Sequence, residues 1–168
     1  MKTILKKISI IFIAAISTIS LVLFSACGSN AEQNNEEKML NKITTFYETV
    51  VSSQECLDEV ADDIYSYWYN AIYKDSYYGN IDLAIAYALS DNATNLNTIE
   101  TNEPIIQSLY KEIRESKLSF EIKAVMSAYS DYYELVVNVS GSFNSYSSSK
   151  ETLKKELASA LKDLSLEL

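Results

Sequence analysis

The hydrophobic positions of this 168-residue chain recur every seven residues over long stretches, which is typical of packed helices. Residues 38–74 contain no glycine or proline, and here the period predicts one long helix. The positions on its apolar seam are Ile43, Phe46, Val50, Ser53, Leu57, Val60, Ile64, Tyr67 and Ala71. A turn is predicted at residues 75–79.

The same period continues through residues 80–116 and predicts a second long helix, with Asn80 as a good N-cap residue. Its seven-residue positions are Ile85, Asn92, Ile99, Ile106 and Ile113. Pro104 either kinks this helix or starts a new one in its first turn. The unbroken register favours a kink. Residues 92–102 are rich in Asn and Thr, so we expect the weakest packing there.

A third helix is predicted from Ser119 to Tyr146, with Gly141 as a weak point inside it. Its seam positions are Ile122, Val125, Tyr129, Val136, Val139 and Phe143. A turn follows at residues 147–149. Ser148 and Glu151 match a capping box, which starts a fourth helix.

The fourth helix repeats leucine at helical spacing, at Leu153, Leu157, Leu161 and Leu164. Short connections between long helices favour antiparallel neighbours. The sequence therefore predicts an all-α fold, an up-down antiparallel four-helix bundle over residues 38–168 whose first two helices are the longest.

The N-terminus has the three parts of a secretory signal in residues 1–26. Three lysines precede an apolar run over residues 8–24, and Ser25 and Ala26 then precede Cys27. An uncleaved membrane-spanning helix is the alternative, because about 20 apolar residues suffice to span. Residues 28–37 are polar, and we expect residues 27–37 to form a flexible tether.

The small residues ending in Cys27 resemble the lipobox of bacterial lipoproteins. The resemblance implies that a diacylglyceryl group is attached to the Cys27 sulfur and that the chain is cut just before it. It implies a mature chain of residues 27–168, held by its lipid on the extracytoplasmic face of the cell membrane. The mature part is loosely similar to small helical lipoproteins of Gram-positive bacteria to which no role is assigned.

The amino-acid composition excludes several classes of function. The mature part keeps all 23 acidic residues but loses three of the 14 basic ones, so its net charge is about −12. Such a chain will not bind nucleic acid or an anionic membrane face through general electrostatics. Histidine is absent, which excludes Ser-His-Asp catalysis, di-iron Glu-x-x-His sites and ordinary zinc sites. We expect no enzyme, no metal and no cofactor beyond the diacylglycerol on Cys27.

One thiol remains after Cys27, so no intrachain disulfide can form. Cys56 is either buried or joins two chains, and burial is favoured. A group of acidic residues lies in residues 43–73, which contain no Lys or Arg: Glu48, Glu55, Asp58, Glu59, Asp62 and Asp63. A solvated helix face is a better interpretation of this group than a cation site.

Aromatic residues concentrate near the end of the first helix, at Tyr65, Tyr67, Trp68, Tyr69, Tyr73, Tyr77 and Tyr78. Tyr67 and Trp68 fall on the seam side and are expected in the core. Tyr65, Tyr69 and Tyr73 form a stripe that is either covered by a later helix or open to a partner.

The up-down topology places the end of the first helix and the turn at residues 147–149 at one membrane-distal tip. We predict a non-enzymatic binding surface there, made by Tyr69, Tyr73, Tyr77, Tyr78, Asn144 and Tyr146. This mixture of residue types is typical of antibody-like binding surfaces. The expected partner is an envelope protein or a cell-wall glycan.

Two alternatives stay open. The first is a carrier that holds a small apolar or aromatic molecule inside the bundle, in a cavity beside Tyr87 and Tyr129. The second is a passive spacer in the cell envelope.

Overall fold

A computed structural model describes residues 30–168, with side chains from residue 34 onward. The chain divides into two compact units, residues 1–33 and 34–168, and only the second is described below. The predicted signal and Cys27 lie outside the described residues. The described part contains five α-helices, one short 3-10 helix and no strand, which confirms the all-α prediction for it. No helix within residues 30–168 combines the length and apolarity needed to cross a membrane.

Helix α2 (Asn30–Tyr73) is 44 residues long and carries the predicted seam. It begins at Asn30 rather than at residue 38, so helix replaces the predicted tether over residues 30–37. This segment contains Ala, Glu and Gln and no glycine or proline, a composition that favours helix. The predicted seam positions that are buried are Ile43, Phe46, Val50, Ser53, Leu57, Val60, Ile64 and Ala71.

The second predicted helix is divided into α3 (Ile81–Asp91) and α4 (Ala93–Ile113), after the 3-10 helix η1 (Ser76–Gly79). Asn80 caps α3 as predicted, since its Oδ1 accepts a hydrogen bond from the Leu83 N–H at 3.0 Å. Pro104 lies inside α4, so the helix does continue across it. The prediction of one helix over residues 80–116 is wrong, because the helix is interrupted at Asn92.

The side chain of Asn92 explains this break. Its Nδ2 donates to the Ala88 carbonyl at 3.0 Å and to Asp63 Oδ2 on α2 at 2.8 Å. An asparagine that bonds the backbone in this way competes with the regular helical pattern. Asn92 is nevertheless buried, as its place in the seven-residue register predicts.

Helices α5 (Ser119–Val137) and α6 (Phe143–Ser165) correct the predicted boundaries of the third and fourth helices. The third helix ends nine residues before Tyr146, and the connection is residues 138–142. Gly141 has φ +85°, a left-handed conformation that favours glycine. The predicted turn at residues 147–149 lies within α6.

The observed capping box of α6 uses two serines instead of the predicted pair. Ser142 Oγ accepts from the Ser145 N–H at 3.2 Å, and Ser145 Oγ accepts from the Ser142 N–H at 3.0 Å. The seven-residue spacing through Val139 and Phe143 had suggested that the helix continues here. The local hydrogen bonds of the cap override that spacing.

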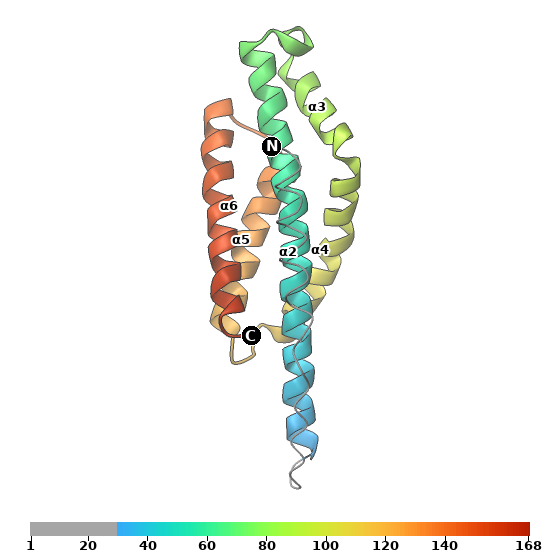
Figure 1. Ribbon diagram of the computed structural model, residues 1–168, viewed down its shortest axis with the longest axis vertical. Coiled ribbons are helices and arrows are strands. Elements are labelled where there is room, and N and C mark those ends of the chain that lie inside the picture. Colours follow the sequence, from blue (N-terminus) through green and yellow to red (C-terminus); the bar gives the residue numbers. More distant parts are fainter. Residues whose placement is uncertain (1–29) are drawn as a thin grey trace, which may run out of the picture. The chain divides into compact units, whose positions relative to one another are not determined.

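Within residues 34–168, α3 and α4 run one after the other along one side of α2, and the α5–α6 hairpin lies along the other (Figure 1). We call the end where α2 stops and α6 starts the tip. The opposite end, where α4 turns into α5 and α6 stops, is called the base. All helices except α3 bury large side chains in the core, whereas α3 buries only Ala84 and Ala88.

The cap at Ser142 gives a test of the corrected boundary. Ser142→Ala should lower the free energy of unfolding by about 1 kcal/mol, because an N-terminal amide of α6 loses its acceptor. Ser148→Ala is the matched control, and it should change stability by less than about 0.5 kcal/mol. Urea unfolding measures both. A larger loss for Ser148→Ala than for Ser142→Ala would contradict the observed boundary.

Candidate functional site

The turn at the tip holds its backbone in an unusual conformation. Asp75, Tyr77 and Tyr78 have φ values of 49°, 57° and 55°, and Gly79 follows with φ 68°. For a residue with a side chain, the left-handed region costs about 1 kcal/mol or more. Tyr78 is also 96% exposed, so its side chain makes almost no contact that would offset this cost.

The tyrosine stripe on α2 is covered in part by a residue of α6. The ring of Phe143 lies 5.1 Å from that of Tyr65, 6.2 Å from that of Tyr69 and 6.1 Å from that of Tyr73, between centroids. Tyr65 is half-buried, whereas Tyr73 is 60% exposed. The stripe is therefore covered at its Tyr65 end and open to solvent at its Tyr73 end. Phe143 was missed as a site residue because its spacing had placed it in the core seam.

A second aromatic group lies on the α3 side of α2. Tyr77 stacks on Tyr67, with centroids 5.4 Å apart, and its centroid lies 5.7 Å from that of Tyr87. The Tyr67 hydroxyl donates to Asp91, and this hydrogen bond is the main reason that its pKa is raised to about 12. Tyr77 is half-buried between its neighbours, so it supports the turn as well as lining the tip.

Tyr146 corrects the predicted binding surface. It is buried, its ring centroid lies 5.6 Å from that of Trp68, and its hydroxyl donates to the Ala61 carbonyl at 3.5 Å. The reason is the earlier start of α6, which places Tyr146 in its first turn against α2. Asn144, in the same turn, is exposed as predicted. Exposed Tyr69, Tyr73 and Asn144 therefore flank Phe143 at the tip.

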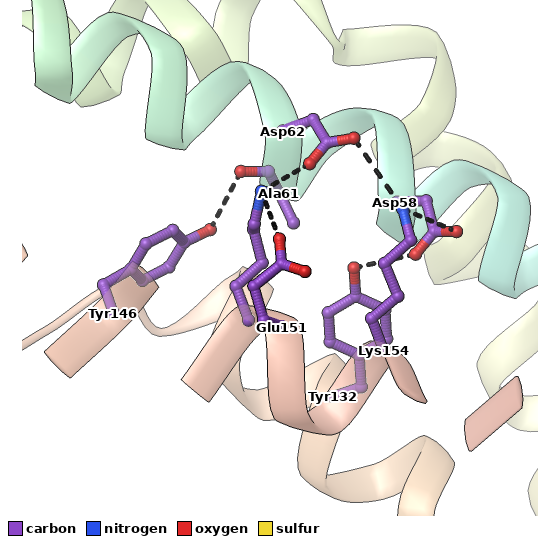
Figure 2. A network of polar contacts seen from close by, with 8 residues as sticks. Asp58, Ala61, Asp62, Tyr132, Tyr146, Glu151 and Lys154 are labelled. Carbon is purple, nitrogen blue, oxygen red and sulfur yellow. Dashed lines mark hydrogen bonds and ion pairs between the residues drawn. The ribbon is translucent and has the colours of Figure 1, made fainter. Parts of the chain in front are cut away.

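The acidic residues of α2 do not form a simple solvated face. Asp58 accepts a hydrogen bond from the Tyr132 hydroxyl of α5 at 2.8 Å and pairs with Lys154 of α6 at 3.2 Å (Figure 2). Asp62 pairs with the buried Lys150 at 2.6 Å and with Lys154 at 3.8 Å. These contacts join α2 to the α5–α6 hairpin.

Two further acids of the group face the opposite side. Asp63 accepts from Asn92, and Glu59 accepts from Asn95 Nδ2 at 2.9 Å. The solvated-face interpretation is therefore wrong for Asp58 and Asp63, which are half-buried between helices. Glu59 and Asp62 are exposed as that interpretation expects, but they also contact the neighbouring helices. The sequence signal was available in the asparagines of residues 92–102, which offer amide donors at helical spacing.

Protonation in this network follows from burial and charge. Burial, with the Asp58 carboxylate beside it, raises the pKa of the Tyr132 hydroxyl, so that it stays a donor. Burial alone would lower the pKa of Lys150, but its bonds to Asp62 and Glu151 outweigh this and raise it. Lys150 is thus charged at neutral pH. Its contribution to stability is complete below the unfolded pKa and is lost as the pH rises through the folded one.

The hydroxyl of Tyr129 is one of the polar groups buried in the core. Tyr129 is fully buried, and its hydroxyl has no hydrogen-bond partner among the described residues. Burial and the nearby Glu103 charge raise its pKa. Asn102 Nδ2 donates to Ser53 Oγ close by, at 3.1 Å. Tyr87, the other tyrosine of the expected carrier cavity, is half exposed on α3, so it does not share the interior with Tyr129.

Cys56 is half-buried. Burial raises the pKa of its thiol, and the carboxylates of Glu59 and Glu55 add to the effect. The thiol is therefore protonated at neutral pH, which makes it a weak nucleophile.

Comparison with protein-family models, with curated proteins and with solved structures gave no match. Among residues 30–168, no three His, Cys, Asp or Glu residues lie close enough together to hold a metal ion. The tip is the candidate site of the described unit because it combines exposed tyrosine rings with a left-handed turn.

The Asp62–Lys150 pair can be tested against an acid one heptad earlier. Asp62→Asn should lower the free energy of unfolding by about 1 kcal/mol, because it weakens the pairing of a buried ammonium while Asp62 itself is half exposed. Glu55→Gln should change it by less than about 0.5 kcal/mol. Urea unfolding at pH 7 compares the two. Equal effects would support the solvated-face interpretation after all.

Proposed function

We propose that this protein is a lipid-anchored extracytoplasmic lipoprotein that acts as a non-enzymatic binding module. We interpret its helices as an up-down four-helix bundle in which α3 and α4 together take the place of the second helix. The observation that carries the proposal is the exposed Tyr78 in a strained turn, at the same tip as Tyr69 and Tyr73.

The anchor is Cys27, three residues before α2 begins. A diacylglycerol on its sulfur holds the chain at the extracytoplasmic face of the cell membrane. An α-helix of 44 residues is about 66 Å long, so α2 carries the tip well away from its own start. The proposal therefore combines a membrane-bound start with an outward-facing tip.

A strained, exposed tyrosine needs an explanation beyond folding. Glycine or asparagine would adopt the left-handed turn at lower cost, and a polar residue would suit a fully exposed position better. A large aromatic side chain at this position gives contact area to a partner with little loss of side-chain entropy. Backbone strain of this kind is concentrated at functional sites.

The other exposed side chains of the tip suit a polar partner with flat apolar faces. Tyr73 offers an exposed ring, and Asn144 adds an amide that can donate and accept hydrogen bonds. An envelope protein or a cell-wall glycan has these properties. Nucleic acid does not fit, because the mature chain carries a net charge of about −12.

A carrier is the second candidate. The fully buried hydroxyl of Tyr129 favours it, because no residue within 34–168 meets hydrogen-bond geometry with it, although the Glu103 carboxylate lies nearby. The tip remains the stronger basis, because its exposed rings are accessible without any rearrangement of the helices.

The binding proposal predicts that stability and recognition respond in opposite directions at one residue. Tyr78→Gly should raise the free energy of unfolding by up to about 1 kcal/mol, because the strain is relieved. The same change should abolish retention of a partner from envelope extract, as should the triple change of Tyr73, Tyr77 and Tyr78 to Ser. Ile105→Ser, exposed on α4 away from the tip, is the control and should retain the partner. Undiminished retention of the partner by Tyr78→Gly would contradict the proposal.

The anchor is tested separately. Cys27→Ser should remove the site of lipid attachment and leave the signal uncut, so the variant should lack the mass of the diacylglyceryl group and keep residues 1–26. Mass spectrometry of the native chain should find a lipid on Cys27 at a new N-terminus. A native chain that keeps residues 1–26 would favour the membrane-spanning alternative.

A further inference from the structure

Two large apolar side chains are exposed at the base, opposite the tip. Phe120, in the first turn of α5, is 79% exposed, and Leu166, just after α6, is 73% exposed. Exposed aromatic and leucine side chains of this size are unfavourable in water. Neither contributes to the core, so the fold itself does not account for them.

The pairing of α5 with α6 relates these two residues. A groove between the two helices is lined by Ala124, Ser127, Ala128 and Asp131 of α5 and by Glu156, Ser159, Ala160 and Asp163 of α6, so these stretches lie side by side. Phe120 precedes Ala124 by one turn on the same face, and Leu166 follows Asp163 by nearly one turn. Figure 1 shows that α5 begins and α6 ends at the same end of the unit. The two exposed apolar side chains therefore belong to the same end of the α5–α6 hairpin, beyond the polar groove between the two helices.

Charge is distributed unevenly between the base and the rest of the described unit. Residues 34–42, 111–123 and 162–168 carry seven basic and seven acidic side chains. The other described residues carry four basic and 15 acidic ones. The base is thus the part of the unit that an anionic surface repels least, and it includes the well-exposed Lys117.

The base is also the end that a lipid on Cys27 holds near a bilayer. Lys117, in the turn between α4 and α5, pairs with Glu36 of α2 at 2.8 Å. The nine residue steps from Cys27 to Glu36 span at most about 30 Å even when fully extended. Any helical part of this segment shortens the reach further. The tip lies more than 30 residues farther along α2.

We propose that Phe120 and Leu166 insert into the interfacial region of the bilayer, so that the base rests on the membrane and the tip faces outward. This inference rests on the lipid anchor of the proposed function. The acyl chains supply most of the membrane affinity, and the two exposed side chains supply a second contact that fixes orientation. An aromatic ring at the level of the lipid headgroups is a favourable placement.

The experiment uses the full lipidated chain in vesicles of phosphatidylglycerol and phosphatidylcholine. Phe120→Trp places a reporter at the base and Tyr78→Trp places one at the tip, while the native Trp68 is buried and common to both. Brominated lipids quench tryptophan only at short range. We expect them to quench most of the added emission of Phe120→Trp and none of that of Tyr78→Trp, with Leu166→Trp behaving like Phe120→Trp.

Three outcomes would overturn the inference, and they separate it from the anchor. Flotation of the chain with vesicles but no quenching at residue 120 or 166 would leave the anchor in place and remove the contact. Equal quenching at residues 78 and 120 would mean that the bundle lies flat. Failure of the native chain to float would remove the anchor and the contact with it. Circular dichroism checks that each variant is folded.

Discussion

Burial of one apolar stripe along α2 is the constraint on which the rest of the unit depends. Its side chains, from Ile43 to Ala71, meet α4, α5 and α6, whose own buried positions belong to the same core. Removing apolar surface of this extent from water is the main term that opposes the entropy of the unfolded chain. The polar contacts on the two flanks of α2 then decide which neighbour lies on which side.

Those flanking contacts differ in kind. On the α6 side, Asp58 and Asp62 meet lysines, so the contact is one of charge. On the α4 side, Glu59 and Asp63 meet asparagine amides. An amide cannot replace an ammonium as the partner of Asp58 or Asp62 without leaving a carboxylate and its counter-charge unpaired, so the α6 flank discriminates against the helix that carries the asparagines. This arrangement gives α2 two different faces from one run of acids.

The sequence predicted those parts of the fold that depend on repeated spacing. The seam of α2 and the buried Ile99, Ile106 and Ile113 of α4 follow one period over several turns, and such averaging makes the prediction robust. Boundaries depend on single hydrogen bonds instead. The Ser142–Ser145 cap and the bond of the Asn92 side chain to the Ala88 carbonyl each span four residues or fewer, and a seven-residue pattern does not detect contacts this local.

The candidate site was predicted in part for the same reason. Tyr73, Tyr78 and Asn144 are exposed as expected, because they follow from the topology and from polar local sequence. Tyr146 was misplaced by the boundary error alone. The left-handed run at Tyr77 and Tyr78 had no counterpart in the sequence, since tyrosine is among the residues least suited to it.

Trp68 is the single tryptophan of the chain, and its surroundings have an optical consequence. Its indole lies within 6 Å of the rings of Phe143 and Tyr146, both from the start of α6. Light absorbed by the neighbouring tyrosines is transferred to an acceptor this close, so the native protein emits mainly from Trp68. Detachment of α6 from α2 near the tip would expose the buried indole to water and shift its emission to longer wavelength. The emission of Trp68 therefore reports whether α6 is packed against α2 at the tip.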